Sequence, residues 1–245
     1  MKRSLFFGLP LLSKSIRISC LSLRAAAPVQ TFVIALLLVF GMGAAASAAE
    51  FQINESAGQM KEPRIATASD GSFVAVWTKG VSNEIWARLF DASDNPVGND
   101  FQISTGVGEY KKPNVSIAAD GSFVVVWEKK NSLTDFSIYA RRFDASGSPL
   151  GGQFLVNTST GELREPRIAS KSDGSFVVVW GKKVSGTVEE VWSRRYDASG
   201  NPLSGEFMVN SSGGKHKKPS LMIAADDSFV IVWERKISDT DILAR

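Results

Sequence analysis

One unit recurs four times along this chain, and the repeat constrains the fold more than any other feature of the sequence. Each copy contains the pattern S-F-V-x-V-W, which ends at Trp77, Trp127, Trp180 and Trp233 with spacings of 50, 53 and 53 residues. A second pattern, F-x-[IV]-[NS], keeps the same period and begins at Phe51, Phe101, Phe154 and Phe207. Such regularity is typical of a protein built by stacking copies of one supersecondary unit.

Each unit carries signals for four short strands. The first strand follows a proline, the second is the S-F-V-x-V-W segment, the third leads into an Asp-Ala-Ser turn, and the fourth is the F-x-[IV]-[NS] segment. Asp-Gly pairs predict tight turns between the first two strands at Asp70, Asp120 and Asp173, with Asp226 at the same place in the last unit. The second strand is apolar at successive positions, which predicts that both of its faces are buried.

This pattern predicts an all-β fold, a four-bladed β-propeller with four antiparallel strands in each blade. The repeat units are residues 51–100, 101–153, 154–206 and 207–245. The first unit opens on a lone fourth strand, Phe51–Asn54, and the last unit stops after a third strand. We therefore expect the N-terminal strand to complete the last blade and close the ring of a monomer. The alternatives are a piece of a larger propeller and two chains that together complete an eight-blade ring.

Residues 1–48 have the composition of a targeting segment. Every charge before Glu50 is positive, and an apolar run over residues 32–46 leads to the small-residue sequence Ala46-Ser47-Ala48. These features predict a secretory signal peptide cleaved after Ala48, and the alternative is an uncleaved membrane anchor. We therefore expect a propeller domain over residues 49–245, without a transmembrane span after processing, in a secreted, periplasmic or cell-surface protein.

The leader also accounts for the basic charge of the chain. It holds 5 of the 28 Lys and Arg residues, which leaves 23 against 25 Asp and Glu, and it holds the single cysteine, Cys20. The remaining chain is close to neutral and free of cysteine, so it offers no disulfide framework, no thiolate metal cluster and no general affinity for nucleic acid.

The repeat has a counterpart among known proteins. The segment S-F-V-V-V-W, followed by I-Y-A-R-R-F-D-A-S-G-S-P-L-G-G-Q-F, resembles a tandem repeat of about 50 residues in secreted and surface proteins of bacteria. The resemblance covers nearly all of residues 51–245 and implies a propeller-like, extracellular and non-catalytic module. The phrase S-D-G-S-F is also similar to the Asp-box of sialidase-type propellers, but the Asp-box spacing S-x-D-x-G-x-T-W is not met, so no sialidase activity is inferred.

Two basic positions recur in every unit and fall on one face of the predicted propeller. One lies two residues before the proline and the other two residues after the tryptophan. A cationic mouth of this kind would attract an anionic glycan or a cell-envelope polymer, and the alternative is solvated charge in surface ion pairs. The copies differ three residues before the proline, where Tyr110 and His216 fall on opposite blades of a four-blade ring and could face each other across the mouth. The candidate ligand-binding residues are Lys61, Lys111, Arg164, Lys217, Lys79, Lys129, Lys182, Arg235, Tyr110 and His216.

The sequence suggests no cofactor. His216 is the only histidine and is expected to be exposed in a loop, so a multi-histidine metal site is excluded. The Asp-Ala-Ser-x-x-Pro turns resemble the start of a calcium loop but lack its glycine and its distal glutamate, and an aspartate that bonds its own turn explains them more simply. The repeat tryptophans are interpreted as core, whereas Trp86, Tyr139 and Trp192 are better placed to stack on a sugar.

These observations predict a non-catalytic binding module for an anionic glycan or envelope polymer. The alternatives are a structural or assembly module, such as a fragment of a larger adhesin, and a glycan-active enzyme. An enzyme could use a carboxylate pair such as Glu109 and Glu162, although the chain carries no nucleophile motif, phosphate loop or zinc signature.

Overall fold

A computed structural model describes residues 50–224, 226 and 228–245. The predicted signal peptide lies outside the described residues. Among the described residues there is no helix, and hence none that could cross a bilayer. The strands are β1 (Met60–Thr67), β2 (Phe73–Lys79), β3 (Glu84–Phe90), β4 (Pro96–Gln102), β5 (Glu109–Ile117), β6 (Phe123–Lys130), β7 (Phe136–Phe143), β8 (Phe154–Leu155), β9 (Glu162–Ser170), β10 (Phe176–Lys183), β11 (Glu189–Tyr196), β12 (Phe207–Met208), β13 (Lys215–Ile223), β14 (Phe229–Lys236) and β15 (Thr240–Ala244).

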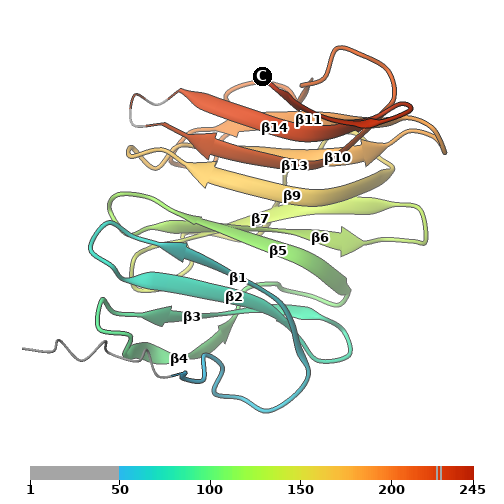
Figure 1. Cartoon of the computed structure of the whole chain (residues 1–245). Coiled ribbons are helices and arrows are strands. Elements are labelled where there is room, and N and C mark those ends of the chain that lie inside the picture. Colours follow the sequence, from blue (N-terminus) through green and yellow to red (C-terminus); the bar gives the residue numbers. More distant parts are fainter. Residues whose placement is uncertain (1–49, 225, 227) are drawn as a thin grey trace, which may run out of the picture. The chain divides into compact units, whose positions relative to one another are not determined.

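The strands pair in four successive antiparallel groups, which we call sheet 1 (β1–β4), sheet 2 (β5–β8), sheet 3 (β9–β12) and sheet 4 (β13–β15). Sheets 3 and 4 are also joined by a single parallel pair, Glu189 with Lys215. Figure 1 shows the groups stacked face to face, with sheet 1 at one end and sheet 4 at the other. The predicted all-β fold with four antiparallel strands in a unit is therefore confirmed for sheets 1 to 3.

The second strands form the core, and in sheets 2 and 3 their side chains alternate between the two neighbouring sheets. In sheet 2, Val125 and Trp127 pack toward sheet 1, whereas Val124 and Val126 pack toward sheet 3. Because the second strands are apolar on both faces, each sheet has two apolar faces to bury, as the sequence predicts. Aromatic stacking of Phe123 on Phe143, with ring centroids 5.0 Å apart, adds to the packing within the sheet.

The turn between the first two strands is wider than the predicted two-residue turn. In sheet 1, Ala68 and Ser72 close a three-residue loop, with Ala68 N bonded to Ser72 O at 2.8 Å. Gly71 has φ +93°, a conformation that glycine adopts without the steric penalty of a Cβ. The Asp70 carboxylate accepts bonds from the N–H and the hydroxyl of Ser72, so it holds the loop in place.

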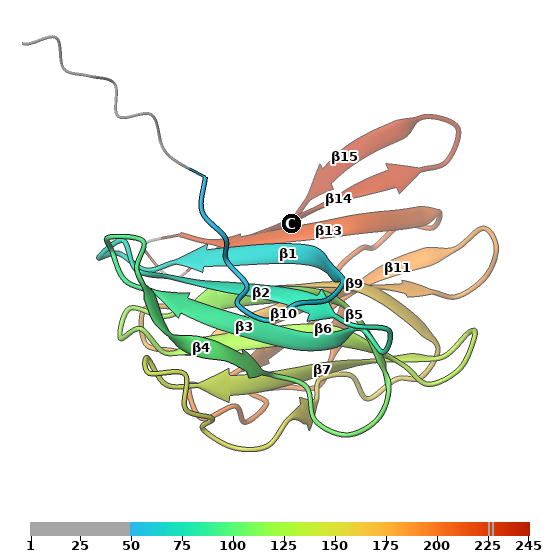
Figure 2. The ribbon, with the colours of Figure 1, turned by 90° about the horizontal axis from the view of Figure 1, so that it is seen from below.

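The predicted ring closure is absent from this structure. Among the described residues β15 pairs only with β14, and Phe51–Asn54 form no strand with it. Instead, the N-terminal segment lies along sheet 1, where the Arg88 guanidinium donates to Ile53 O at 3.0 Å. In Figure 1 sheets 2 and 3 lie between sheet 1 and sheet 4, and in Figure 2, seen from below, sheet 1 is nearest the viewer with β13–β15 behind it. A closed ring of four would make sheets 1 and 4 neighbours.

Candidate functional site: a carboxylate cluster on the inner strands

The first strand of each sheet contains a bulge at the residue before its proline. The register of β1 with β2 shifts between Lys61 and Arg64, and β5, β9 and β13 show the same irregularity. Proline cannot donate to a ladder, which favours a bulge at this position. The bulge residues have left-handed backbones with φ of 53°, 50°, 54° and 50°: Glu62, Lys112, Glu165 and Lys218. Because this conformation costs about 1 kcal/mol or more for a residue with a Cβ, its recurrence marks a specialised segment.

Two glutamates bond the bulge of the following sheet. Glu62 Oε2 accepts from Lys112 N at 2.7 Å, and Glu128 Oε1 accepts from Glu165 N at 2.5 Å. The Lys112 ammonium also pairs with Glu62 Oε1 at 2.8 Å. These contacts link sheet 1 to sheet 2 and sheet 2 to sheet 3 at the bulges of their first strands.

The environments of Glu62 and Glu128 push their pKa values in opposite directions. Burial raises the pKa of Glu128 to about 7, because the Glu165 N–H and the Lys112 charge offset only part of the desolvation while the Glu62 and Glu165 charges add to it. Burial also acts to raise the pKa of Glu62, but the bonds from Lys112 outweigh it and the pKa falls below the usual range. With an exposed fraction of 4%, Glu128 is a carboxyl that is partly protonated at neutral pH beside one that is ionised.

Two arginines complete this group. Burial and the nearby Arg64 lower the pKa of Arg167, while the charges of Glu165 and Glu128 raise it. Each arginine also donates through Nη1 to the carbonyl of the proline before it, which fixes the side chain at the inner strand. We call this set the carboxylate cluster: Glu62, Glu128, Glu165, Arg64, Lys112 and Arg167.

Two clefts flank the carboxylate cluster. The cleft between sheets 1 and 2, of about 410 Å³, includes Glu62, and the cleft between sheets 3 and 4, of about 190 Å³, includes Glu165. Six of the ten residues proposed from sequence line these clefts: Lys61, Lys111, Arg164, Lys182, His216 and Lys217. The basic positions on this side of the molecule therefore surround the carboxylates.

Most of these cations already have a partner. Lys111 pairs with Glu109 at 2.5 Å, Lys217 with Glu189 at 3.2 Å and Arg235 with Asp241 at 2.5 Å. Arg164 pairs with Glu162.

Three more of the proposed cations lie over aromatic rings. The ring centroids are 3.8 Å from Lys79 for Trp86, 5.7 Å from Lys129 for Tyr139 and 5.3 Å from Lys182 for Trp192. The arrangement is a network of ion pairs and cation–π contacts, as in the alternative interpretation, and the aromatic faces proposed for sugar stacking are shared with lysines.

Tyr110 and His216 do not face each other across a mouth. Both are buried in the interfaces between sheets, and the expectation that His216 is exposed is wrong. Tyr110 donates its hydroxyl to Thr105 O at 2.8 Å, and His216 bonds Ser212 O and the Trp233 indole at 2.9 Å each. Both side chains stand three residues before the proline of a first strand, just before the bulge, and at this place they point into the core.

The carboxylate pair suggested by the sequence is poorly suited to acid catalysis. Bonds from Lys111 and then Lys130 lower the pKa of Glu109, and Glu162 contacts both Arg164 and Lys183. Sequence reasoning did not single out Glu128 as a candidate site residue. Its only signal is that it follows a repeat tryptophan, where the other units have Thr78, Gly181 and Glu234.

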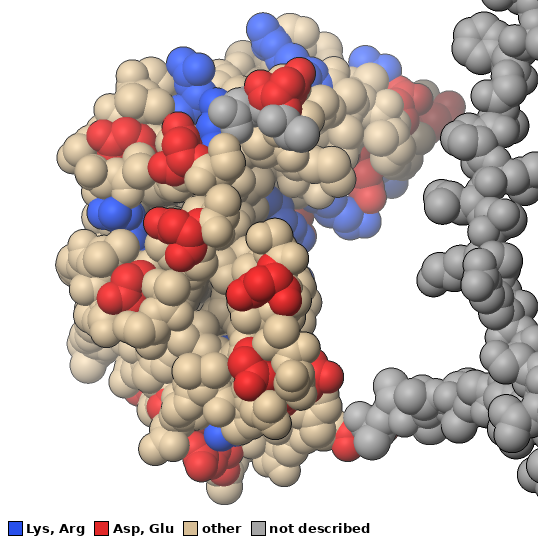
Figure 3. All heavy atoms as spheres, turned by 90° about the vertical axis from the view of Figure 1, so that its left-hand side faces the viewer, with Lys and Arg blue, Asp and Glu red and all other residues tan. Residues whose placement is uncertain are grey.

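The opposite face carries the aspartate turns, and Figure 3 shows acidic side chains distributed over it. Asp91 bonds Ser93 N and Asn95 N at 2.8 and 2.9 Å, and Asp197 bonds Asn201 N at 2.8 Å. The side-chain amides of Asn95 and Asn201, followed by these backbone bonds, lower the pKa of the two aspartates. The described residues contain no group of three or more His, Cys, Asp or Glu side chains arranged to hold a metal ion. The turns thus use their aspartates to bond their own backbone, as the sequence analysis expects.

Comparison with known proteins identifies the fold. No family model matches the sequence, and no curated protein matches it. Among solved structures, the Hadza microbial sialidase Hz136 is similar with a TM-score of 0.57 at 10% identity, over 76% of this chain and 44% of the sialidase. Endo-arabinase from Bacteroides thetaiotaomicron VPI-5482 has a TM-score of 0.47 at 14% identity, over 76% of this chain and 75% of that one. Alpha-L-arabinofuranosidase from Lactobacillus brevis has a TM-score of 0.49 at 11% identity, over 76% and 68%.

The chain has a propeller-like all-β fold similar to that of the sialidase, and it spans less than half of the sialidase's length. This finding corrects the functional prediction. A non-catalytic binding module was expected, with a structural module, an adhesin fragment or a glycan-active enzyme as alternatives, but the solved structure of similar fold is named as a sialidase.

Proposed function

We propose that the protein acts on a glycan and cleaves a glycosidic bond by acid–base chemistry at the carboxylate cluster. The observation that carries this proposal is Glu128, a buried carboxyl with a pKa of about 7 beside Glu62 and Glu165. Glycoside hydrolysis commonly needs two carboxyl groups in different protonation states, one as an acid and one as a base or nucleophile. The sialidase-like fold supports a glycan as the substrate class.

In this proposal Glu128 is the acid that protonates the leaving oxygen. Its proton is retained near neutral pH because burial disfavours the charged form. Glu62 is the ionised partner, since its bonds with Lys112 favour the carboxylate. The two arginines of the cluster add positive charge that can bind sugar hydroxyls or a carboxylate of the substrate.

The experiment measures release of reducing sugar from a panel of neutral and acidic polysaccharides and aryl glycosides. We expect turnover that falls as the pH rises through about 7, since Glu128 then loses its proton. Replacing Glu128→Gln should lower kcat by roughly a hundredfold or more while the fold is retained. No release from any member of the panel, or wild-type turnover in E128Q, would refute the proposal.

A matched control is available in sheet 4. Glu234 follows Trp233 as Glu128 follows Trp127, but it is partly exposed and paired with Lys218 at 2.9 Å. E234Q therefore makes the same chemical change at the equivalent position outside the carboxylate cluster, and turnover should remain within about threefold of wild type, well short of the effect of losing an acid catalyst.

We also propose that the protein is exported, which the basic flank, the apolar run and the small residues before Glu50 support. Expression in a bacterial host should yield a secreted or periplasmic chain that begins at residue 49. Denaturing mass spectrometry distinguishes this product from the uncleaved chain of 26.5 kDa.

A further inference from the structure

The outer face of sheet 4 is apolar and uncovered. Its exposed side chains are Met222, Val230, Val232 and Ile242, with exposed fractions of 74%, 49%, 37% and 70%. The equivalent valines in the second strands of sheets 1 to 3 are buried, because each packs against the following sheet. An exposed apolar sheet face of this kind is typical of a surface that binds another protein surface.

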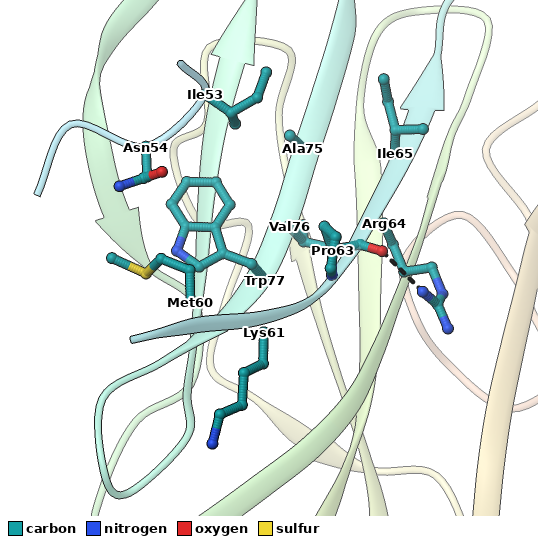
Figure 4. A pocket seen from close by; sticks show the side chains of 10 residues that line it. All are labelled: Ile53, Asn54, Met60, Lys61, Pro63, Arg64, Ile65, Ala75, Val76 and Trp77. Carbon is teal, nitrogen blue, oxygen red and sulfur yellow. Dashed lines mark hydrogen bonds between the residues drawn. The ribbon is translucent and has the colours of Figure 1, made fainter. Parts of the chain in front are cut away.

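The outer face of sheet 1 has no sheet packed on it. Ile53 and Met60 pack against its Trp77 and Ala75, and beside them the face is hollowed. A hollow of about 480 Å³ lies between the N-terminal segment and β1, and Figure 4 shows Ile53, Ile65, Ala75 and Trp77 around it. Ile65 is 60% exposed, whereas its equivalents Val115 and Ile168 are buried against the preceding sheet.

These two faces are the two halves of an interface that occurs three times within the chain. Between sheets 1 and 2, Val74 and Val76 pack with Val125 and Trp127. Between sheets 2 and 3, Val124 and Val126 pack with Val178 and Trp180. Between sheets 3 and 4, Val179 packs with Ile231 and Trp233. By this pattern, the side chains that fit against Ala75 and Trp77 of sheet 1 are Val230 and Val232 of sheet 4.

The backbone edges match in the same way. Three residues that follow the fourth strands make the same two backbone bonds: Ile103, Val156 and Val209. The carbonyl oxygen of each accepts a bond from an arginine of the following sheet, at 2.9, 2.8 and 2.9 Å. The N–H of each donates to the third strand of its own sheet, at 2.8, 2.8 and 2.7 Å. Ile53 accepts the corresponding bond from Arg88 at 3.0 Å. The third-strand carbonyl that would pair with its N–H is that of Ile242, at the outer edge of β15.

An asparagine strengthens this match. Asn157 and Asn210 bond the N–H of Ile138 and Val191 through Oδ1, at 2.7 and 2.8 Å, and their amides donate to the carbonyl two residues on. Asn54 makes the same amide bond, to Ser56 O at 2.9 Å, so its Oδ1 is oriented for a third-strand N–H. The equivalent N–H belongs to Ile242.

We propose that these surfaces bind each other between two copies of the chain, with sheet 4 of one copy on sheet 1 of the other. Two such contacts close a ring of eight sheets, within the range of about four to eight blades that propellers adopt. A second copy is the occupant because each copy presents both halves of this interface, and sheets 2 and 3 lie between sheets 1 and 4 within one copy, so the two faces do not meet there (Figure 1).

Native mass spectrometry of the full chain tests the proposal, with denaturing mass spectrometry giving the mass of one copy. We expect two copies at micromolar concentration. Ile65→Asp and Val232→Asp should each raise the dissociation constant at least about a hundredfold, because each buries an unpaired charge in the contact. The control Leu133→Asp, at a loop residue that is 83% exposed and remote from both faces, should leave the dimer intact.

Mixing the two variants separates this contact from other association. The I65D chain keeps an intact sheet 4 face and the V232D chain an intact sheet 1 face, so the mixture should form a 1:1 complex that neither forms alone. Since both residues are exposed in one copy, both variants should fold, which circular dichroism verifies. A monomeric wild type, which would indicate closure within one chain, a ladder of higher masses, or no complex in the mixture would each overturn the proposal.

Discussion

The indole N–H of Trp233 donates to Nδ1 of His216 at 2.9 Å, and this bond distinguishes sheet 4 from the other three. The equivalent indole nitrogens of Trp77, Trp127 and Trp180 are buried without a hydrogen-bond partner. The difference follows from the residue three before the proline, which is histidine only in the last unit. Both side chains of the pair are buried between sheets 3 and 4, so the bond is shielded from water.

Replacing His216→Leu should therefore destabilise the protein. The change leaves the Trp233 N–H without a partner in the core, which costs about 1–3 kcal/mol of unfolding free energy. Urea unfolding followed by tryptophan fluorescence measures the effect. A double-mutant cycle with Trp233→Phe isolates the bond, and a coupling energy near zero would contradict its stabilising role.

The pKa of Glu128 predicts a stability that depends on pH. Its carboxyl has a pKa of about 7 in the folded chain against 4.5 for the free group, so the folded state holds more protons between these pH values. Stability contributed by this group is therefore fully present below pH 4.5 and lost as the pH rises to about 7, by roughly 3 kcal/mol.

The variant E128Q tests this dependence. A glutamine can still accept the bond from Glu165 N but carries no charge to desolvate, so its unfolding free energy should stay nearly constant over the interval. E128Q should accordingly match the wild type near pH 5 and exceed it near pH 8 in urea unfolding. Parallel pH profiles for the two proteins would rule out Glu128 as the titrating group.

The strand order of each unit could be predicted from sequence because one segment, the S-F-V-x-V-W strand, is apolar on both of its faces. Val126 and Trp127 are apolar on opposite faces of β6, and a strand between two packed sheets accommodates that. The ion-pair partners of some of the basic residues proposed for ligand binding could also have been predicted. Glu109 and Lys111 are two residues apart on one strand, so their side chains point to the same face.

The role of Glu128 could not be predicted, because residue type and position are identical for Glu128 and Glu234. Sheet 3 covers Glu128, whereas no sheet among the described residues covers Glu234 in the same way. The pKa therefore depends on burial by a neighbouring sheet, and burial is a property of the packed structure and not of the repeat.

Gly121 in the turn between β5 and β6 predicts a local effect of substitution. Its φ is +81°, and an added Cβ would lie 2.9 Å from the Cβ of Ala145. Gly121→Ala should therefore lower the unfolding free energy by about 1–2 kcal/mol, from the left-handed backbone and the clash. Gly152→Ala is the control, since a Cβ there meets nothing within 4 Å. Equal melting temperatures for the two variants would exclude this account of the turn.

Val126 and Val232 occupy the same place in the repeat and differ in what covers them. Val126 is fully buried between sheets 2 and 3, and Val232 is 37% exposed on sheet 4. Val126→Ala should cost about 2 kcal/mol of unfolding free energy at any protein concentration, because it leaves a cavity within the chain.

Val232→Ala should cost much less in dilute solution, and more as the protein concentration rises, because the second copy proposed above buries this side chain. Thermal unfolding across a hundredfold range of concentration measures both variants. The midpoint of V232A should fall increasingly below that of the wild type as concentration rises, while the deficit of V126A stays constant. A V232A deficit independent of concentration would show that sheet 4 is covered within one chain or not at all.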